Sequence, residues 1–138
     1  MKPEEYSTAI IKLLPIAQGN TGGSRVAAQV LLSAYNGSAF QLDVVDLCNL
    51  DKEHYAAALG VIRGRVELGI EPHTLVKNGS RIFEGLWLKW ERYHITNRGI
   101  PDCYFCYGTG MVYADETGGD ELKQCPECYG KGFVSEKP

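Results

Sequence analysis

The sequence predicts a mainly α-helical protein that ends in a small cysteine-rich β-hairpin. Apolar residues recur at helical spacing up to about residue 95, with capping and breaking residues between the segments. Beyond residue 97 this spacing stops, and two Cys-x-x-Cys pairs follow. We therefore expect two domains: a compact bundle of about five helices over residues 1–97, and a cysteine-stapled hairpin over residues 98–138.

Two helices are predicted before residue 36. An apolar stripe from Tyr6 to Leu14 predicts the first, and it is expected to stop near Pro15 because proline lacks the N–H that a helix needs. Residues 20–23 then form a break. Ser24 is expected to cap a second helix over residues 25–35, which ends at an Asn-Gly pair.

Three further helices are predicted after an apolar connection over residues 42–50. Asp51 is expected to cap the first of them, with an acidic residue in its first turn. A short helix starts at Glu-Pro-His within residues 71–79 and ends at Asn-Gly. Ser80 is expected to cap a longer helix that carries both tryptophans of the chain, through Trp90.

The most specific motif is Cys-x-x-Cys-x-Gly-x-Gly, which occurs twice with 18 residues between the two cysteine pairs. This spacing is typical of tetrahedral zinc sites, in which four thiolates leave no open coordination position for catalysis. Paired cysteines in a reducing compartment favour a metal over disulfides. We predict one structural Zn²⁺ per chain, bound by Cys103, Cys106, Cys125 and Cys128.

The glycines of the motif have predicted roles in the backbone. Gly108 and Gly130 stand where the chain turns sharply, through positive φ angles that glycine adopts at little cost. Gly110 and Gly132 are expected to let the two cysteine turns approach each other across the site.

Short strands are expected around these turns. Residues 111–114 and Gln124, together with residues 133–134, could pair around a turn at residues 117–120. A segment of about 35 residues cannot fold by core burial alone. Zinc binding, which contributes on the order of 10 kcal/mol in small peptides, would supply much of its folding free energy.

The repeated motif resembles the cysteine-rich zinc-finger region of the Hsp40 (DnaJ) co-chaperones, where four copies build two zinc sites in a bent β-hairpin. This chain has two copies and lacks the His-Pro-Asp signature of the J-domain, so the resemblance implies one zinc site and no co-chaperone activity. Single-site versions occur in the anti-TRAP protein, which binds another protein, and in some phage antiterminators. The resemblance covers roughly a quarter of the chain.

The helical part is similar to an uncharacterised family of small proteins encoded on bacterial plasmids, integrative elements and phages. The similarity rests on residues 22–37 and 42–47 and continues through the Glu-Pro-His and Asn-Gly segments, so it spans about residues 17 to 90. It implies an accessory or host-takeover role for a mobile element or phage.

Charge and hydropathy argue against some classes of protein. The net charge is −3 at pH 7, and residues 100–138 carry seven acidic residues against three lysines, which leaves about +1 for the helical part. An acidic cysteine segment repels a phosphate backbone. No apolar run is long enough for a membrane span, and the first residues do not form a signal peptide, so a cytoplasmic protein is expected.

The remaining cysteine and the histidines are expected to be structural. Cys48 lies in the apolar connection and is expected to be a buried thiol. His54, His73 and His94 share no ligand spacing and are expected at the surface or half-buried. Neither paired carboxylates nor an activated serine can be recognised, so we expect no enzyme and no small-molecule substrate.

Two groups of residues are candidate partner surfaces. Aromatic residues around the cysteines are too many for so small a hairpin to bury, which favours a protein partner or a homo-oligomer contact. Basic residues alternate with tryptophans in the helix expected up to residue 98, a mixture that also suits nucleic acid, although tryptophans at helical spacing usually belong to a core. The candidates are Tyr104, Phe105, Tyr107 and Tyr129 in the first group and Arg81, Lys89 and Arg92 in the second.

Three hypotheses for function follow. The first is a non-enzymatic, zinc-binding accessory protein that acts by protein–protein interaction, inhibiting or redirecting a host factor. The first alternative is a nucleic-acid-associated transcriptional regulator that uses the basic helix over residues 81–98. The second alternative is a thiol-disulfide or redox chaperone with Cys-x-x-Cys as its active dithiol.

Overall fold

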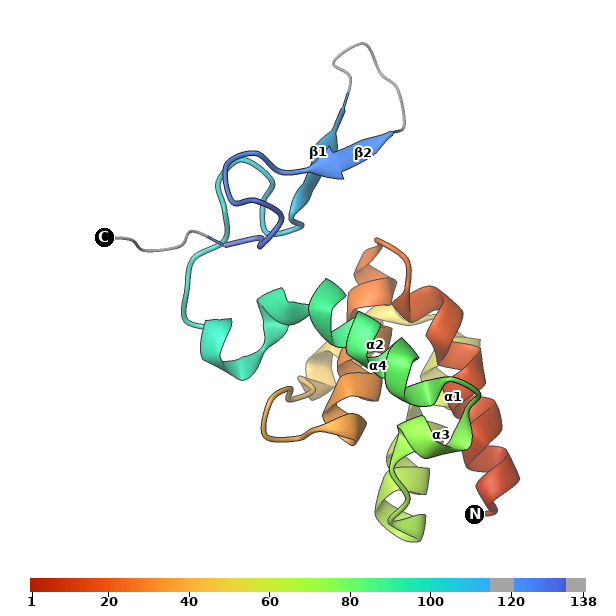
Figure 1. Cartoon of the computed structure of the whole chain (residues 1–138). Helices are drawn as coiled ribbons and strands as arrows, with labels where there is room; N and C mark the ends of the chain where they lie inside the picture. The colour runs from red at the N-terminus through yellow and green to blue at the C-terminus, as the bar shows by residue number, and fades with distance from the viewer. Residues whose placement is uncertain (115–120, 134–138) are drawn as a thin grey trace. The chain divides into compact units, whose positions relative to one another are not determined.

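The computed structural model describes residues 1–114 and 121–133, and its contacts divide the chain into two compact units, Met1–Ile95 and Thr96–Pro138 (Figure 1). The described residues are mainly helical with one two-stranded hairpin, which confirms the predicted fold class. The α-helices are α1 (Pro3–Ala17), α2 (Gly22–Tyr35), α3 (Lys52–Leu68) and α4 (Gly79–Lys89), and the 3₁₀ helices are η1 (Val44–Asn49), η2 (Pro72–Leu75), η3 (Glu91–Tyr93) and η4 (Ile95–Asn97).

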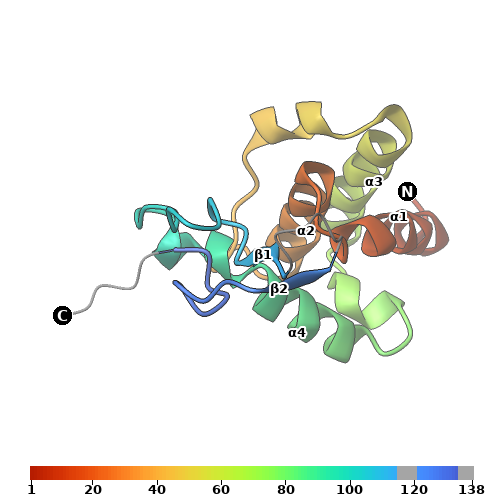
Figure 2. The same ribbon diagram turned by 90° about the horizontal axis from the view of Figure 1, so that it is seen from above.

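Helix α2 is the centre of the first unit. It packs against α1, α3 and α4, and α1 also packs along α3 (Figure 2). Apolar side chains at helical spacing on all four helices meet in one core, as the sequence predicts. The largest fully buried side chains include Tyr6, Ile10, Leu13, Val26, Val30, Leu31, Leu32, Phe40, Val61, Phe83 and Leu86.

Helix α1 ends near Pro15, as predicted, but Pro15 itself lies inside the helix, which continues to Ala17. A proline removes one backbone N–H from the helix ladder. Here it stands in the last turn, where only two more residues continue the helix. The burial of Leu14 and Ala17 against the core holds that turn in place, and the Gln18 N–H still donates to the Leu14 carbonyl at 3.1 Å.

Two of the three predicted N-caps are wrong. Helix α2 begins at Gly22, and its cap is Thr21, whose Oγ1 accepts a hydrogen bond from the Ser24 N–H at 3.0 Å. Helix α4 begins at Gly79, after Asn78 in a left-handed conformation, so Ser80 lies inside the helix. A Cβ atom at Gly79 would overlap the His73 carbonyl, which explains why glycine stands at that position.

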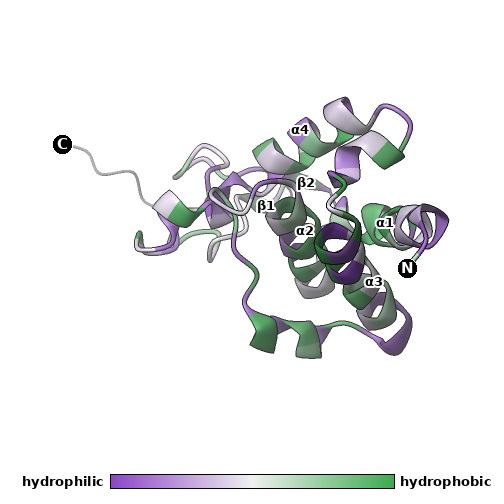
Figure 3. Cartoon of the chain, turned by 90° about the horizontal axis from the view of Figure 1, so that it is seen from below, coloured by the Kyte–Doolittle hydropathy of each residue, from purple (hydrophilic) through white to green (hydrophobic). Residues whose placement is uncertain are grey.

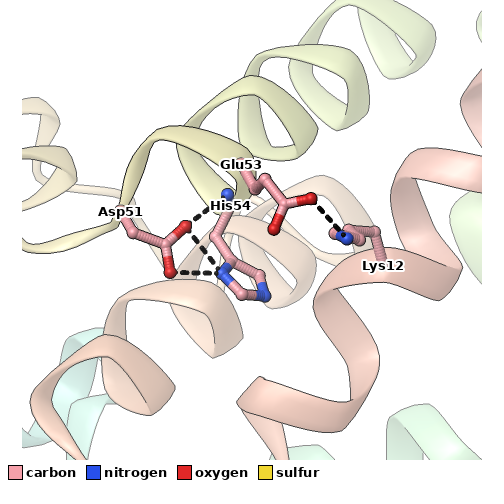
Figure 4. A network of polar contacts seen from close by, with 4 residues as sticks. All are labelled: Lys12, Asp51, Glu53 and His54. Carbon is pink, nitrogen blue, oxygen red and sulfur yellow. Dashed lines mark hydrogen bonds and ion pairs between the residues drawn. The ribbon is translucent and has the colours of Figure 1, made fainter.

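The cap at Asp51 is confirmed. Its Oδ1 accepts from the His54 N–H at 2.9 Å, and the His54 Nδ1 also lies 2.9 Å from both carboxylate oxygens (Figure 4). Glu53, the second residue of α3, accepts a hydrogen bond from the Lys12 Nζ at 3.1 Å. The start of α3 is therefore fixed both to its own cap and to α1.

The apolar connection before α3 forms η1 and has two faces. Leu42, Leu47 and Leu50 pack against the core, whereas Val44 and Val45 are exposed, and Figure 3 shows this hydrophobic segment along the outside of the unit. The expected burial of Cys48 is wrong, because this thiol is exposed. A short 3₁₀ helix turns only part of an apolar sequence toward the core.

The second unit contains the hairpin. Strand β1 (Met111–Tyr113) pairs antiparallel with β2 (Leu122–Gln124), with Met111 opposite Gln124 and Tyr113 opposite Leu122. Phe133 forms an isolated bridge with Asp102. The predicted turn at residues 117–120 and the end of the predicted last strand lie outside the described residues.

Candidate metal centre

The four cysteines of the repeated motif form one buried cluster in the second unit. Their Sγ atoms all lie within 4.8 Å of one another, and each residue is at most 5 % exposed. The Sγ distances are 3.9 Å from Cys103 to Cys125 and 3.6 Å from Cys106 to Cys128. Zn–S bonds of about 2.3 Å in a tetrahedron place the sulfurs about 3.8 Å apart, whereas a disulfide needs about 2.05 Å. The cluster therefore fits a four-coordinate metal ion.

Backbone N–H groups point at two of the sulfurs in the same way. The Gly110 N–H donates to the Sγ of Cys106 and the Gly132 N–H donates to the Sγ of Cys128, both at 3.2 Å. Each donor lies four residues after its cysteine, at the last glycine of the motif. These bonds stabilise negative charge on sulfur, which is the form that binds a metal.

The two cysteine turns are also tied to each other by equivalent bonds. The Cys103 N–H donates to the Gly132 carbonyl at 3.0 Å, and the Cys125 N–H donates to the Gly110 carbonyl at 2.9 Å. Each turn thus accepts from the first cysteine of the other. The two copies of the motif are related by an approximate twofold arrangement about the sulfur cluster.

The predicted glycine roles are confirmed for the turns. Gly108 has φ +89° and Gly130 has φ +82°, so both occupy conformations that other residues rarely adopt. A Cβ atom at Gly110 would lie 2.5 Å from the carbonyl oxygen of Gly130. The close approach of the two turns therefore requires glycine at this position, as the sequence predicts.

The pKa values of the facing thiols diverge because the sulfurs are close together. Burial raises the pKa of Cys106, but hydrogen bonds from the Gly110 and Gly108 N–H groups, together with those from the Cys128 and Cys103 thiols, outweigh it and lower the pKa to about 7. Burial, only partly offset by the Gly132 N–H, and the neighbouring Cys106 raise the pKa of Cys128 to about 12. Metal binding must therefore release a proton from this pair.

Residues 7–91 match the model of DUF7673, a family of unknown function. The chain belongs to this family. The matched region lies in the first unit, and the cysteine cluster lies beyond it. No curated protein and no solved structure matches the chain. No helix among the described residues has the length and apolar character that crossing a membrane requires.

Two tyrosines at equivalent positions of the motif have an unusual backbone conformation, which we did not predict from the sequence. Tyr107 and Tyr129 each follow the second cysteine of a motif, and both have φ +56°. Their side chains are 83 % and 73 % exposed. The left-handed region is uncommon for residues other than glycine, asparagine and aspartate. The only sequence signal was the recurrence of Cys-Tyr-Gly in both copies.

The other predicted aromatic candidates lie on the first cysteine turn. Tyr104 and Phe105 are exposed, and their rings meet edge to face at 6.4 Å. The Tyr104 hydroxyl donates to Glu127 Oε1 of the second turn at 2.8 Å, and this bond raises the pKa of the tyrosine. Aromatic and acidic side chains therefore lie side by side next to the sulfur cluster.

The predicted basic residues of the DUF7673 protein do not lie on one continuous helix. Helix α4 ends at Lys89, and Arg92 belongs to η3. Arg81 and Lys89 are exposed, while Trp87 and Trp90 pack against the core as expected. The sequence suggested one helix over residues 81–98, but Trp90 adopts a conformation that ends α4.

The three histidines lie apart in the first unit. His54 contacts Asp51, the N-cap of α3. The His73 ring meets the Tyr35 ring edge-on, with 5.1 Å between the ring centres, and the centres of the His94 and Phe40 rings are 5.5 Å apart. All three are half-buried, as predicted. Over residues 1–114 and 121–133, the cysteine cluster is the one group of three or more potential metal ligands.

Proposed function

We propose that this DUF7673 protein is a non-enzymatic, zinc-binding accessory protein that contacts another protein through its cysteine unit. The pair Tyr107 and Tyr129 carries the proposal. Both rings are exposed beside the sulfur cluster, and both stand on backbone that disfavours tyrosine. Exposed aromatic residues on a rigid support are typical of the centres of protein interfaces.

Zinc is the metal that suits the cluster best. Four thiolates at tetrahedral spacing form a closed site of the structural type, with no open position for a substrate. The burial of all four sulfurs also argues against the redox alternative, because a reactive dithiol needs an accessible thiolate. In this proposal the metal folds the unit and holds its surface side chains in place.

The backbone conformation of the two tyrosines favours a role in binding over a role in folding. A left-handed residue other than glycine costs about 1–2 kcal/mol, and asparagine tolerates that conformation better than tyrosine does. Asparagine would therefore serve the fold at least as well at both positions. The rings contribute little to the buried core of the unit, and a partner surface accounts for them.

The biological setting is proposed from the family resemblance. Similarity to small proteins of plasmids, integrative elements and phages supports an accessory role in a bacterial mobile element. The partner would then be a host factor that the protein inhibits or redirects.

The test is a comparison of two variants in affinity capture from a bacterial host lysate. Tyr107→Asn/Tyr129→Asn removes both rings and relieves the backbone strain, so zinc content and stability should not fall. Tyr113→Asn removes an exposed ring from β1 and serves as the matched control.

We expect the wild type and the Tyr113→Asn control to retain the same protein in a defined stoichiometry, and the double variant to lose it while keeping its metal. Retention of that protein by the double variant would overturn the proposal. Size-exclusion chromatography adds a second readout, because a self-contact through these rings would show as a dimer that the double variant loses.

A further inference from the structure

Three cations from two distant parts of the chain gather around two aromatic rings in the first unit. The Lys89 Nζ lies 5.5 Å from the centre of the Trp90 ring, and the Arg25 guanidinium lies 5.5 Å from the centre of the Tyr93 ring. Arg92 also lies over Tyr93, at 6.0 Å. The Trp90 and Tyr93 rings are themselves 6.1 Å apart, so the five side chains form one cluster.

Contacts with the rest of the unit hold this cluster in place. The Trp90 Nε1 donates to the Ala17 carbonyl at 2.9 Å, which fixes the indole against the end of α1. The Lys89 Nζ donates to Asn20 Oδ1 at 2.8 Å, and Arg25 pairs with Asp46 at 3.0 Å. Binding groups that are already ordered lose less conformational entropy when a ligand arrives.

We propose that this basic–aromatic cluster binds the phosphate groups of a single-stranded nucleic acid. The cluster comprises Arg25, Lys89, Trp90, Arg92 and Tyr93, and Asn20 holds Lys89 in place. Cations that follow a phosphate backbone, interleaved with aromatic rings on which bases stack, are the combination that single-strand-binding proteins use. Trp90 and Tyr93 are half-buried, so part of each ring remains accessible. The inference goes beyond the proposed protein contact, because it assigns a separate ligand to the DUF7673 region.

The charge distribution favours this site over the rest of the molecule. Residues 100–138 carry a formal charge of −4, and the remainder of the chain carries about +1. A polyanion is therefore repelled by the cysteine unit and attracted only where cations concentrate. Asp46 neutralises part of the charge of Arg25, so we expect weak, salt-sensitive and sequence-independent binding.

The experiment measures fluorescence anisotropy of labelled RNA and DNA single strands of about 20 nucleotides, titrated with the full chain between roughly 50 and 200 mM salt. Three phosphate contacts predict a slope of log K against log salt near −2. In Lys89→Ala/Arg92→Ala the slope should fall to about −0.7, with a loss of roughly tenfold or more in affinity at the lowest salt. Lys89→Ala alone, at an exposed position, should give a slope near −1.4.

Two controls make the result specific to the cluster. Arg63→Ala removes an exposed cation on α3 that pairs with Glu67, and Arg81→Ala removes one at the opposite end of α4. Both should bind as the wild type does. Absence of saturable binding at low salt, equal losses for Arg63→Ala or Arg81→Ala, or tighter binding to anionic phospholipid vesicles than to the single strands would each overturn the proposal.

Discussion

A methyl group on Gly110 would lie 2.5 Å from the carbonyl oxygen of Gly130. These residues belong to the two cysteine turns, and their backbones approach more closely than any side chain permits. The same Gly110 donates its N–H to Cys106 and accepts from Cys125 through its carbonyl. One glycine therefore couples the spacing of the turns to the positions of the sulfurs.

Gly110→Ala should disrupt the metal centre without disturbing the first unit. The substitution combines the contact with Gly130 and a φ of +78°, which alone costs alanine about 1–2 kcal/mol. We expect zinc affinity, measured by competition with a chromophoric chelator, to fall roughly tenfold or more. In Gly99→Ala, where a Cβ meets nothing within 4 Å, affinity should be unchanged.

Two helical glycines should respond to alanine in opposite directions. A Cβ at Gly64 of α3 would overlap the ring of Tyr6, so Gly64→Ala should destabilise the first unit by about 1–3 kcal/mol in denaturant unfolding. Gly85 of α4 is exposed with no neighbour within 4 Å, so Gly85→Ala should stabilise by about 0.5–1 kcal/mol. Equal effects of the two substitutions would contradict the packing of α1 on α3.

The cap of α3 should make stability depend on acid pH. Hydrogen bonds from the His54 backbone and ring lower the pKa of Asp51 in the folded state. Its contribution is therefore present above the unfolded pKa, near 4, and is lost as the pH falls through the lower folded value. Asp51→Ala should lower the melting temperature by a few degrees at neutral pH.

Asp51→Asn is the matched variant, because asparagine caps helices without titrating. It should preserve most of the neutral-pH stability and remove this part of the acid dependence. A melting curve of Asp51→Asn with the same acid dependence as the wild type would show that the shift at Asp51 does not contribute.

The buried Tyr6 should make the stability of the folded state fall as the pH rises in the alkaline range. Burial raises its pKa to about 12, and its hydroxyl donates to the Ile70 carbonyl at 2.9 Å. The folded state keeps a proton that the unfolded chain releases near pH 10, so stability should fall as the pH rises from about 10 to 12. Tyr6→Phe should cost about 1 kcal/mol at neutral pH and flatten that alkaline slope. An unchanged slope in urea unfolding would contradict this origin.

The parts that sequence predicted well depend on local spacing. Two Cys-x-x-Cys-x-Gly-x-Gly copies imply a four-sulfur cluster because each copy folds around its own turn, and the Asp51 cap depends on its own next residues. The parts that it missed depend on tertiary contacts. Pro15 remains helical because the core holds the last turn, and Cys48 is exposed because η1 turns it outward.

The basic–aromatic cluster also depends on tertiary contacts that the sequence alone does not reveal. Lys89 and Arg92 could be recognised from the sequence, but Arg25 and Asn20 join them only through the packing of α2 and the α1–α2 turn against the end of α4. No periodicity along the chain connects residues that are almost 70 positions apart in sequence.

The zinc content of the full chain, purified under reducing conditions without chelators, tests the central claim most directly. We predict one zinc per chain by elemental analysis, lost in Cys125→Ser, whose hairpin should unfold while most of the helical circular dichroism remains. A zinc content near zero in wild-type protein with reduced thiols, or full zinc retention by Cys125→Ser, would contradict it.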